Sequence, residues 1–177
     1  MKINTAGWVS GLHRVASPNC DARPHGTAID MLVIHNISLP PGEFGGSAIV
    51  QLFTNTLDLG AHPYYAKLKD LKVSAHFLIC RSGELMQFVP CGKRAWHAGV
   101  SSWQGRPACN DFSIGIELEG SDDVPFSEPQ YTALVRLTRR LKRAYPIRHI
   151  AGHSDIAPGR KTDPGSCFDW ARYLAGV

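Results

Sequence analysis

Apolar runs in the first half of the chain predict strands buried in a sheet. Residues 31–36, MLVIHN, are apolar and β-branched and lead into a Pro- and Gly-rich loop, which is typical of a buried strand that ends at a loop. Residues 75–80 and 84–89 flank Arg81-Ser82-Gly83, and this arrangement predicts an antiparallel hairpin. Gly83 is expected to adopt a positive φ there.

A further strand is predicted by strict alternation over residues 112–120, FSIGIELEG. Because side chains of a strand point alternately to its two faces, the isoleucines and the leucine share one face, and Glu117 and Glu119 share the other. Alternation alone does not distinguish the two carboxylates. A carboxylate on the surface of the sheet is the alternative to a catalytic one.

Helical spacing appears in two segments. Residues 47–57 suit a short helix, and apolar residues three and four apart predict a longer one over residues 127–145. Ser127 and Gln130 have the spacing of a capping box at its start, and Pro146 ends it. Basic residues on the outer face of this helix are interpreted as solvated surface. They are Arg136, Arg139, Arg140, Lys142 and Arg143.

The carboxyl-terminal part predicts one more strand and one more helix. Residues 149–153 are predicted to form a short strand, and the chain is expected to leave this strand at Gly152. The spacing of Ser166 and Asp169 predicts the cap of a last helix, which carries Phe168, Trp170 and Leu174. Helices, a hairpin and isolated strands in this order predict an α/β fold in which helices flank a mixed central β-sheet.

Composition narrows the class of protein. A chain of 177 residues with 44% hydrophobic residues predicts a single domain over 1–177 with a core large enough to need no metal for stability. The net charge of +4 gives no support for nucleic-acid binding, and no apolar stretch is long enough to span a membrane. The amino terminus does not resemble a signal peptide, so we expect a cytoplasmic protein whose five widely spaced cysteines are reduced thiols.

Two histidines and one aspartate follow predicted strands. His35 and His153 lie at strand ends, and Asp163 lies in a Pro- and Gly-rich loop soon after the second. Two imidazoles and one carboxylate form a common catalytic zinc set, which leaves the fourth tetrahedral position open. The spacing alone is weak evidence, because the chain has eight histidines. The other six are interpreted as hydrogen-bonded or surface residues.

Five blocks of sequence, from about residue 7 to residue 174, carry a resemblance to a known family. They are VIHNISLPPGEFGG, VSAHFLI, RAWHAGVSSWQGR, CNDFSIGIELEG and GHSDIAPGRKTDPG. In this order they resemble the AmpD-type N-acetylmuramoyl-L-alanine amidases and, more distantly, peptidoglycan recognition proteins and phage amidases. The resemblance implies a zinc amidase that cuts the amide between 1,6-anhydro-N-acetylmuramic acid and L-alanine when peptidoglycan is recycled.

Carried over by position, the resemblance implies roles for individual residues. His35, His153 and Asp163 correspond to the ligands of one zinc ion per chain. Glu117 corresponds to the catalytic glutamate, so Glu119 is interpreted as structural. Lys161 corresponds to a lysine near the metal that stabilises the oxyanion; without the resemblance it would be interpreted as a solvated loop residue.

The resemblance also implies a substrate-binding set, which consists of Asn36, Trp96, His97, Ala98 and Arg106. An aromatic face such as that of Trp96 can pack on a sugar, although a core anchor is an equal alternative for this residue. The expected partner is an anhydromuropeptide, and we expect a monomer.

Two other functions stay open at this stage. One is a broader periplasmic or phage amidase, and the other is a non-catalytic peptidoglycan-binding module. The presence of all five metal and catalytic residues favours an enzyme. The absence of a signal peptide and of wall-binding repeats favours the recycling amidase, although a phage enzyme released through a holin needs no signal peptide either.

Overall fold

The computed structural model describes residues 2–177 and is built around a six-stranded mixed sheet. Across the sheet the strands are β1 (His13–Arg14), β5 (Leu85–Gln87), β4 (Phe77–Ile79), β9 (Ser113–Glu119), β3 (Met31–Ile37) and β10 (His149–Gly152). Neighbouring strands are parallel except for the hairpin of β4 and β5. This confirms the expected α/β fold.

Two further strand pairs lie outside this sheet. They are β2 (Cys20–Ala22) with β6 (Lys93–Ala95), and β7 (Ser102–Trp103) with β8 (Arg106–Pro107). A short 3-10 helix, η2 (Cys109–Asp111), leads from the second pair into β9. None of these short elements was expected from the sequence.

The central strands β3 and β9 are buried on both faces. Leu32 and Ile34 of β3 pack with the isoleucines of β9 in the main hydrophobic cluster, whereas Met31 and Val33 point to the opposite face and pack with Phe112. Parallel strands covered on both faces are typically apolar throughout, as β3 is. The alternation predicted for β9 is present, but its polar face is buried as well.

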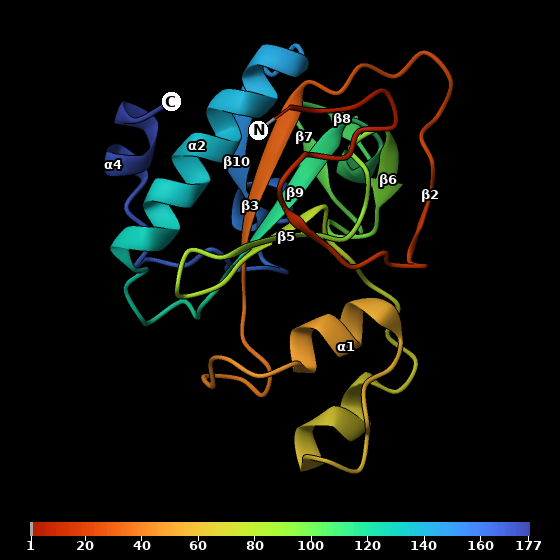
Figure 1. Cartoon of the computed structure of the whole chain (residues 1–177), viewed down its shortest axis with the longest axis vertical. Helices are drawn as coiled ribbons and strands as arrows, with labels where there is room; N and C mark the ends of the chain where they lie inside the picture. The colour runs from red at the N-terminus through yellow and green to blue at the C-terminus, as the bar shows by residue number, and fades with distance from the viewer. Residues whose placement is uncertain (1) are drawn as a thin grey trace.

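The long helix α2 (Glu128–Ala144) covers one face of the sheet, and α4 (Trp170–Ala175) lies beside it (Figure 1). The expected capping box is confirmed: the Gln130 backbone N–H donates to Ser127 Oγ, and the Ser127 N–H donates to Gln130 Oε1. A hydrogen bond of 2.7 Å between the buried Thr138 and Tyr173 hydroxyls joins the two helices. Within residues 2–177 no helix combines the length and the hydrophobicity needed to cross a bilayer.

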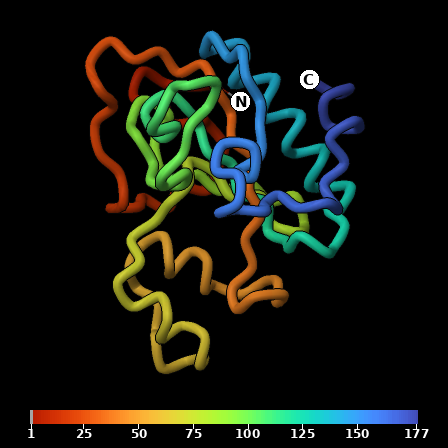
Figure 2. The backbone as a smooth tube through the Cα atoms, turned by 180° about the vertical axis from the view of Figure 1, so that it is seen from behind, coloured from red at the N-terminus to blue at the C-terminus, as the bar shows by residue number. Residues whose placement is uncertain are grey.

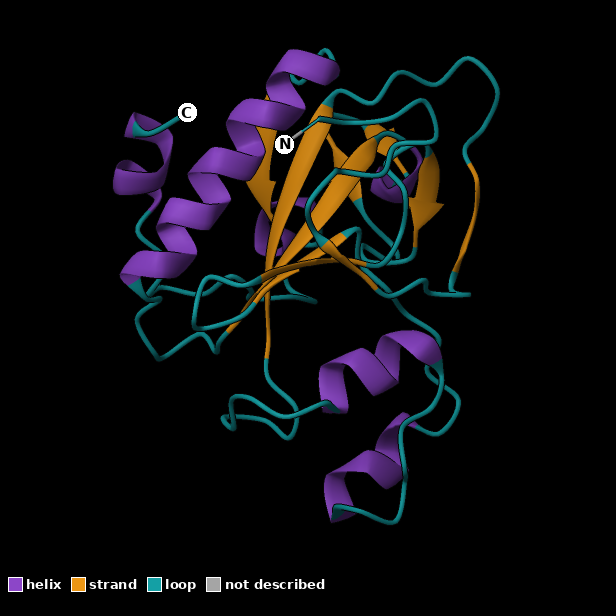
Figure 3. Ribbon diagram, viewed as in Figure 1, coloured by secondary structure: helices purple, strands orange, loops and turns teal. Residues whose placement is uncertain are grey.

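The helix α1 (Ala48–Thr54) and the 3-10 helix η1 (Pro63–Leu68) lie beyond the carboxyl end of β3 (Figure 3). Their apolar residues join a second cluster that includes Phe53, Tyr65 and Phe88. Figure 2 shows the same pair of helices from behind, below the segment that follows β10. The short helix expected over residues 47–57 is therefore confirmed, whereas η1 was not expected.

Two expectations for the carboxyl-terminal part were wrong. Asp169, not Ser166, caps α4, because its side chain accepts a hydrogen bond from the Arg172 N–H. Phe168 consequently precedes the helix. The predicted strand ends at Gly152, and His153 begins the short helix α3 (His153–Ile156), so the chain turns at this histidine.

Candidate metal centre and catalytic cavity

Strand register places three of the predicted metal and catalytic residues at one edge of the sheet. His35 of β3 pairs in register with Glu117 of β9. On the other side of β3, β10 pairs with β3 as far as Gly152, which lies opposite Ile34. His153 is the next residue and therefore lies at the same edge of the sheet. Because carboxyl ends of parallel strands meet at one edge, residues more than a hundred positions apart in the sequence lie side by side.

The three predicted metal ligands form a compact triangle. Nδ1 of His35 lies 3.0 Å from Nδ1 of His153 and 3.0 Å from Oδ2 of Asp163, and the last two atoms are 3.1 Å apart. Ligands about 2.05 Å from a tetrahedral ion would be about 3.3 Å apart, so the triangle is close to the size that an ion needs. These three residues could therefore hold a metal ion.

The protonation states at the triangle also favour a cation. Burial lowers the pKa of His35 to about 4, although the hydrogen bond to Asp163 opposes this shift. Burial acts to raise the pKa of Asp163, but hydrogen bonds to His153 and His35 outweigh it, and the pKa is lowered. At neutral pH His35 is thus neutral and Asp163 is ionised, which are the states that metal binding requires.

Glu117 and Glu119 share a face of β9 but differ in their partners. The carboxylate of Glu119 accepts hydrogen bonds from the backbone N–H groups of Gly45 and Arg81. Oε2 of Glu117 is buried without a hydrogen-bond partner. Burial, and then the charge of Asp163, raise the pKa of Glu117 well above its ordinary value. A buried, strongly perturbed and unpaired carboxylate is typical of a functional site, whereas Glu119 joins two loops.

A cavity of about 270 Å³ opens over this edge of the sheet. Glu117, Lys161 and the three ligand residues all contribute to its lining. Its other wall is apolar, and sequence reasoning missed it. That wall comes from α1, η1 and the segment after η1, and consists of Leu52, Phe53, Tyr64, Leu68, Leu71 and Val73. No signal in the sequence of these segments pointed to the cavity, because apolar residues there predict only a core.

The predicted substrate-binding residues fall into two groups. Asn36, Trp96 and His97 line the cavity. The Asn36 amide donates hydrogen bonds to Asp122 Oδ1 and to the carbonyl oxygen of Pro164. The second bond holds the loop that carries Asp163 against β3. Trp96 is partly exposed, which leaves part of its ring available to a ligand.

The structure does not bring Ala98 and Arg106 into the cavity lining. Ala98 is buried, and its carbonyl oxygen is 3.0 Å from Nε2 of His153. The Arg106 guanidinium pairs with Asp30 at 2.8 Å and lies over the ring of Phe112. The contact of both residues with substrate stays a prediction; in this structure their partners are protein groups behind the metal triangle or away from it.

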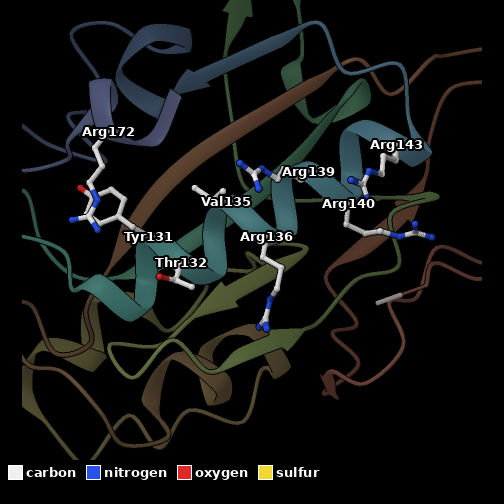
Figure 4. Close-up of a pocket in the computed structure, with 8 residues that line it drawn as sticks. All are labelled: Tyr131, Thr132, Val135, Arg136, Arg139, Arg140, Arg143 and Arg172. Atoms are coloured by element: carbon white, nitrogen blue, oxygen red, sulfur yellow. The ribbon is translucent and has the colours of Figure 1, made fainter. Parts of the chain in front are cut away.

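A larger groove of about 640 Å³ runs along the outer face of α2, away from the metal triangle. Four arginines of α2 and Arg172 of α4 project around it (Figure 4). The α2 arginines, at positions 136, 139, 140 and 143, are exposed or partly exposed, which confirms that this face of the helix is the outer one. The groove contains no pair of groups suited to acid–base or metal chemistry.

The fold and site together define a class of α/β proteins in which a buried carboxylate lies beside a His-His-Asp triangle that could hold a metal ion. Residues 25–166 match the sequence profile of the N-acetylmuramoyl-L-alanine amidase family. The chain belongs to this family.

Individual relatives resemble the chain over nearly its full length. It is 57% identical to the 1,6-anhydro-N-acetylmuramyl-L-alanine amidase AmpD of Escherichia coli over 169 residues, which cover 94% of this chain and 92% of that protein. It is 49% identical to AmpD of Haemophilus influenzae over 174 residues, with 97% and 95% covered. A crystal structure of an AmpD selenomethionine derivative superposes with a TM-score of 0.97 at 56% identity, covering 100% of this chain and 99% of that one.

The structure of a more distant relative is a complex with its substrate. E. coli AmiD in complex with anhydro-N-acetylmuramic acid-L-Ala-D-gamma-Glu-L-Lys has a TM-score of 0.62 and 32% identity, and covers 87% of this chain and 60% of its own. An endolysin amidase of Clostridium intestinale, at 18% identity and a TM-score of 0.68, shares the fold.

Proposed function

We propose that this protein is a zinc-dependent amidase that hydrolyses the amide between 1,6-anhydro-N-acetylmuramic acid and L-alanine in anhydromuropeptides. The observation that carries the proposal is the triangle of His35 Nδ1, His153 Nδ1 and Asp163 Oδ2 beside the unpaired carboxylate of Glu117 in one cavity. Identity of 57% to an AmpD enzyme over nearly the whole chain supports the choice of substrate.

The proposed cofactor is one zinc ion, held by His35, His153 and Asp163. Two imidazole nitrogens and one carboxylate oxygen suit zinc, and three protein ligands leave a fourth position open, as in other catalytic zinc sites. When bound, zinc supplies Lewis-acid activation of water and of the scissile carbonyl. The neutral His35 and ionised Asp163 described above favour its binding.

Glu117 acts as the general base in this proposal. Its carboxylate accepts a proton from the attacking water and delivers that proton to the L-alanine nitrogen as the amide bond breaks. A raised pKa suits both steps, because a stronger base takes the proton more readily and its conjugate acid remains available near neutral pH. Its in-register position beside His35 on a buried strand holds the carboxylate rigidly next to the metal triangle.

Lys161 stabilises the negative charge that develops on the carbonyl oxygen. It is exposed and lines the same cavity as Glu117, so its ammonium group can approach a bound substrate from the solvent side. A positively charged group that approaches the developing oxyanion lowers the energy of the transition state. Lys161 need not touch the metal triangle to do so.

Substrate binding follows from the shape of the cavity. The apolar wall, together with Trp96, offers surface on which a sugar ring can pack, and the polar floor faces the amide. AmiD binds an anhydromuramyl peptide, which supports the same substrate class here. The proposed role in peptidoglycan recycling also implies a cytoplasmic location, as expected from the sequence.

Mass spectrometry of reaction products tests this proposal. The zinc-loaded protein is incubated in parallel with an anhydromuropeptide and with the matching muropeptide that lacks the anhydro ring. We expect release of the intact peptide from the anhydro substrate and little from the other. Equal cleavage of both would replace the proposal with a broader wall amidase, and cleavage of neither by zinc-loaded protein would favour a binding module.

A further inference from the structure

The two histidines of the metal triangle each have a second ring nitrogen that points away from it. Nε2 of His35 lies 3.0 Å from Nδ1 of His97, and Nε2 of His153 lies 3.0 Å from the carbonyl oxygen of Ala98. The two partners are adjacent in the chain. Residues 97–98 therefore contact both histidines from behind the triangle.

Hydrogen-bond chemistry fixes the proton on His153. A carbonyl oxygen only accepts, so Nε2 of His153 must donate to Ala98, and Nδ1 keeps its lone pair toward Asp163. The guanidinium of Arg160 also donates to the Ala98 oxygen, at 2.6 Å. This oxygen thus holds the imidazole in the tautomer that a ligand through Nδ1 requires.

If His35 also binds a metal through Nδ1, it starts a relay of hydrogen bonds in which each group donates to the next. If Nδ1 of His35 binds a metal, its Nε2 carries the proton and His97 Nδ1 must accept it. His97 then has its own proton on Nε2, which lies 3.1 Å from Ser113 Oγ. The Ser113 hydroxyl in turn donates to the carbonyl oxygen of Cys109 at 2.6 Å. The relay ends on a group that accepts only, so its direction is determined.

Asn110 and Gly115 determine the position of His97. Oδ1 of Asn110 accepts from the backbone N–H groups of both His97 and Ala98, at 3.1 and 2.8 Å. The His97 ring lies against Gly115 of β9, where a Cβ would come within 2.4 Å of the ring. A side chain at position 115 would therefore push the imidazole away from His35.

We propose that His97 is a positioning residue for the metal centre. Together with Ser113, His97 selects the tautomer of His35 that presents Nδ1 to the metal. The inference rests on the proposed function, because it takes the triangle to be the zinc site. It also changes the role expected for His97: although the ring borders the cavity, both of its nitrogens are engaged by protein groups. A histidine is an unusual acceptor for a ligand histidine, since it can itself donate, and Ser113 removes that ambiguity.

Zinc affinity, measured by competition with a chromophoric chelator, tests the proposal by substitution. His97→Leu removes the acceptor and should weaken zinc binding about 10- to 100-fold. His97→Asn places an amide oxygen near the position of Nδ1 and should restore most of the affinity. The matched control is His76→Leu, because His76 is equally buried beside His97 but contacts Gly115, Arg23 and Lys93 instead of a proposed ligand.

Both leucine variants are expected to lose thermal stability, and only His97→Leu should lose zinc affinity. Wild-type affinity in a folded His97→Leu protein would overturn the proposal. An equal loss of affinity in His76→Leu would also overturn it, since it would reduce the role of His97 to general packing.

Nitrogen-15 NMR of histidine-labelled, zinc-loaded wild-type protein tests the tautomers directly and needs no destabilised variant. In the zinc-loaded protein we expect both His35 and His97 to carry their proton on Nε2. In metal-free protein, where no ion fixes the proton of His35, we expect Ser113→Ala to let the proton of His97 exchange between its two nitrogens. A proton on Nδ1 of His97 in the wild-type protein would contradict the relay. Failure of the wild-type protein to bind zinc at all would instead refute the proposed function, so the two failures are distinguishable.

Discussion

Replacing Glu117 by glutamine separates the catalytic role of this carboxylate from its effect on stability. Glutamine has nearly the same shape, so the strand pairing with His35 and the metal triangle should persist. The amide can neither accept a proton from water nor carry a charge. We therefore expect Glu117→Gln to bind zinc normally, to hydrolyse substrate much more slowly and to be more stable than the wild-type protein.

The size of each effect follows from the environment of Glu117. Loss of a positioned general base typically slows a reaction about 10²- to 10⁴-fold, which corresponds to about 3 to 6 kcal/mol at about 1.4 kcal/mol per factor of ten. Burial raises the pKa of Glu117, so the folded protein holds this proton at pH values where the unfolded chain has lost it. The residue therefore destabilises the metal-free protein increasingly as pH rises above about 4.5, by about 1.4 kcal/mol for each unit by which its pKa is raised.

Two assays read these effects independently. Single-turnover release of peptide, measured by chromatography at saturating zinc, gives the loss of rate. Urea unfolding of metal-free protein at pH 5 and pH 7 gives the stability, and the advantage of Glu117→Gln should be larger at pH 7. A variant with wild-type turnover would refute the assignment of Glu117 as the base. A stability difference that does not grow with pH would refute the argument from burial.

Three other changes have expected outcomes. Asp163→Asn removes the carboxylate from the metal triangle and should abolish turnover and stoichiometric zinc binding, which is measured by metal analysis after dialysis. Retention of one zinc per chain would contradict the ligand assignment. Ser127→Ala breaks the capping box of α2 and should lower the free energy of unfolding by about 0.5 to 2 kcal/mol without altering zinc content, as judged by urea titration. Burial, aided by Arg23, lowers the pKa of His76 to about 3, so stability should fall as pH drops from about 6.5 toward 3, by up to about 1.4 kcal/mol per pH unit from this group. The unfolded state binds the proton more readily in that window, and His76→Asn should flatten the measured slope.

The long elements were predictable because their patterns repeat several times. The apolar run of β3, the alternation of β9 and the spacing and capping box of α2 each extend over seven or more residues. Strands such as β1 and β7 have only two residues, which is too short to show any period. The last helix was misassigned at its start because Ser166 and Asp169 both have capping side chains, and only the folded backbone selects Asp169.

The site was predictable in its ligands and less so in its surroundings. His35 and His153 stand out because they follow predicted strands, and Asp163 stands out because it lies in a Pro- and Gly-rich loop soon after His153. The resemblance then supported all three as ligands. Alternation alone did not distinguish Glu117 from Glu119, and only the resemblance favoured Glu117. The tertiary structure adds a physical difference, because Gly45 and Arg81, which engage only Glu119, come from other parts of the chain.

The surroundings of the ligands were harder to anticipate. The resemblance placed residues 96–98 near the cleft, but which atoms face the cavity depends on packing that no local pattern encodes. The carbonyl of Ala98, for example, is directed at His153.

The most direct test of the central claim is a zinc titration of metal-stripped protein, with release of peptide from an anhydromuropeptide as the readout. The rate should be negligible without zinc, rise linearly with added zinc and reach its plateau at one ion per chain. The same titration of Asp163→Asn should stay flat. Full hydrolysis by the metal-stripped wild-type protein, or a plateau that Asp163→Asn also reaches, would contradict the claim that His35, His153 and Asp163 hold the catalytic metal.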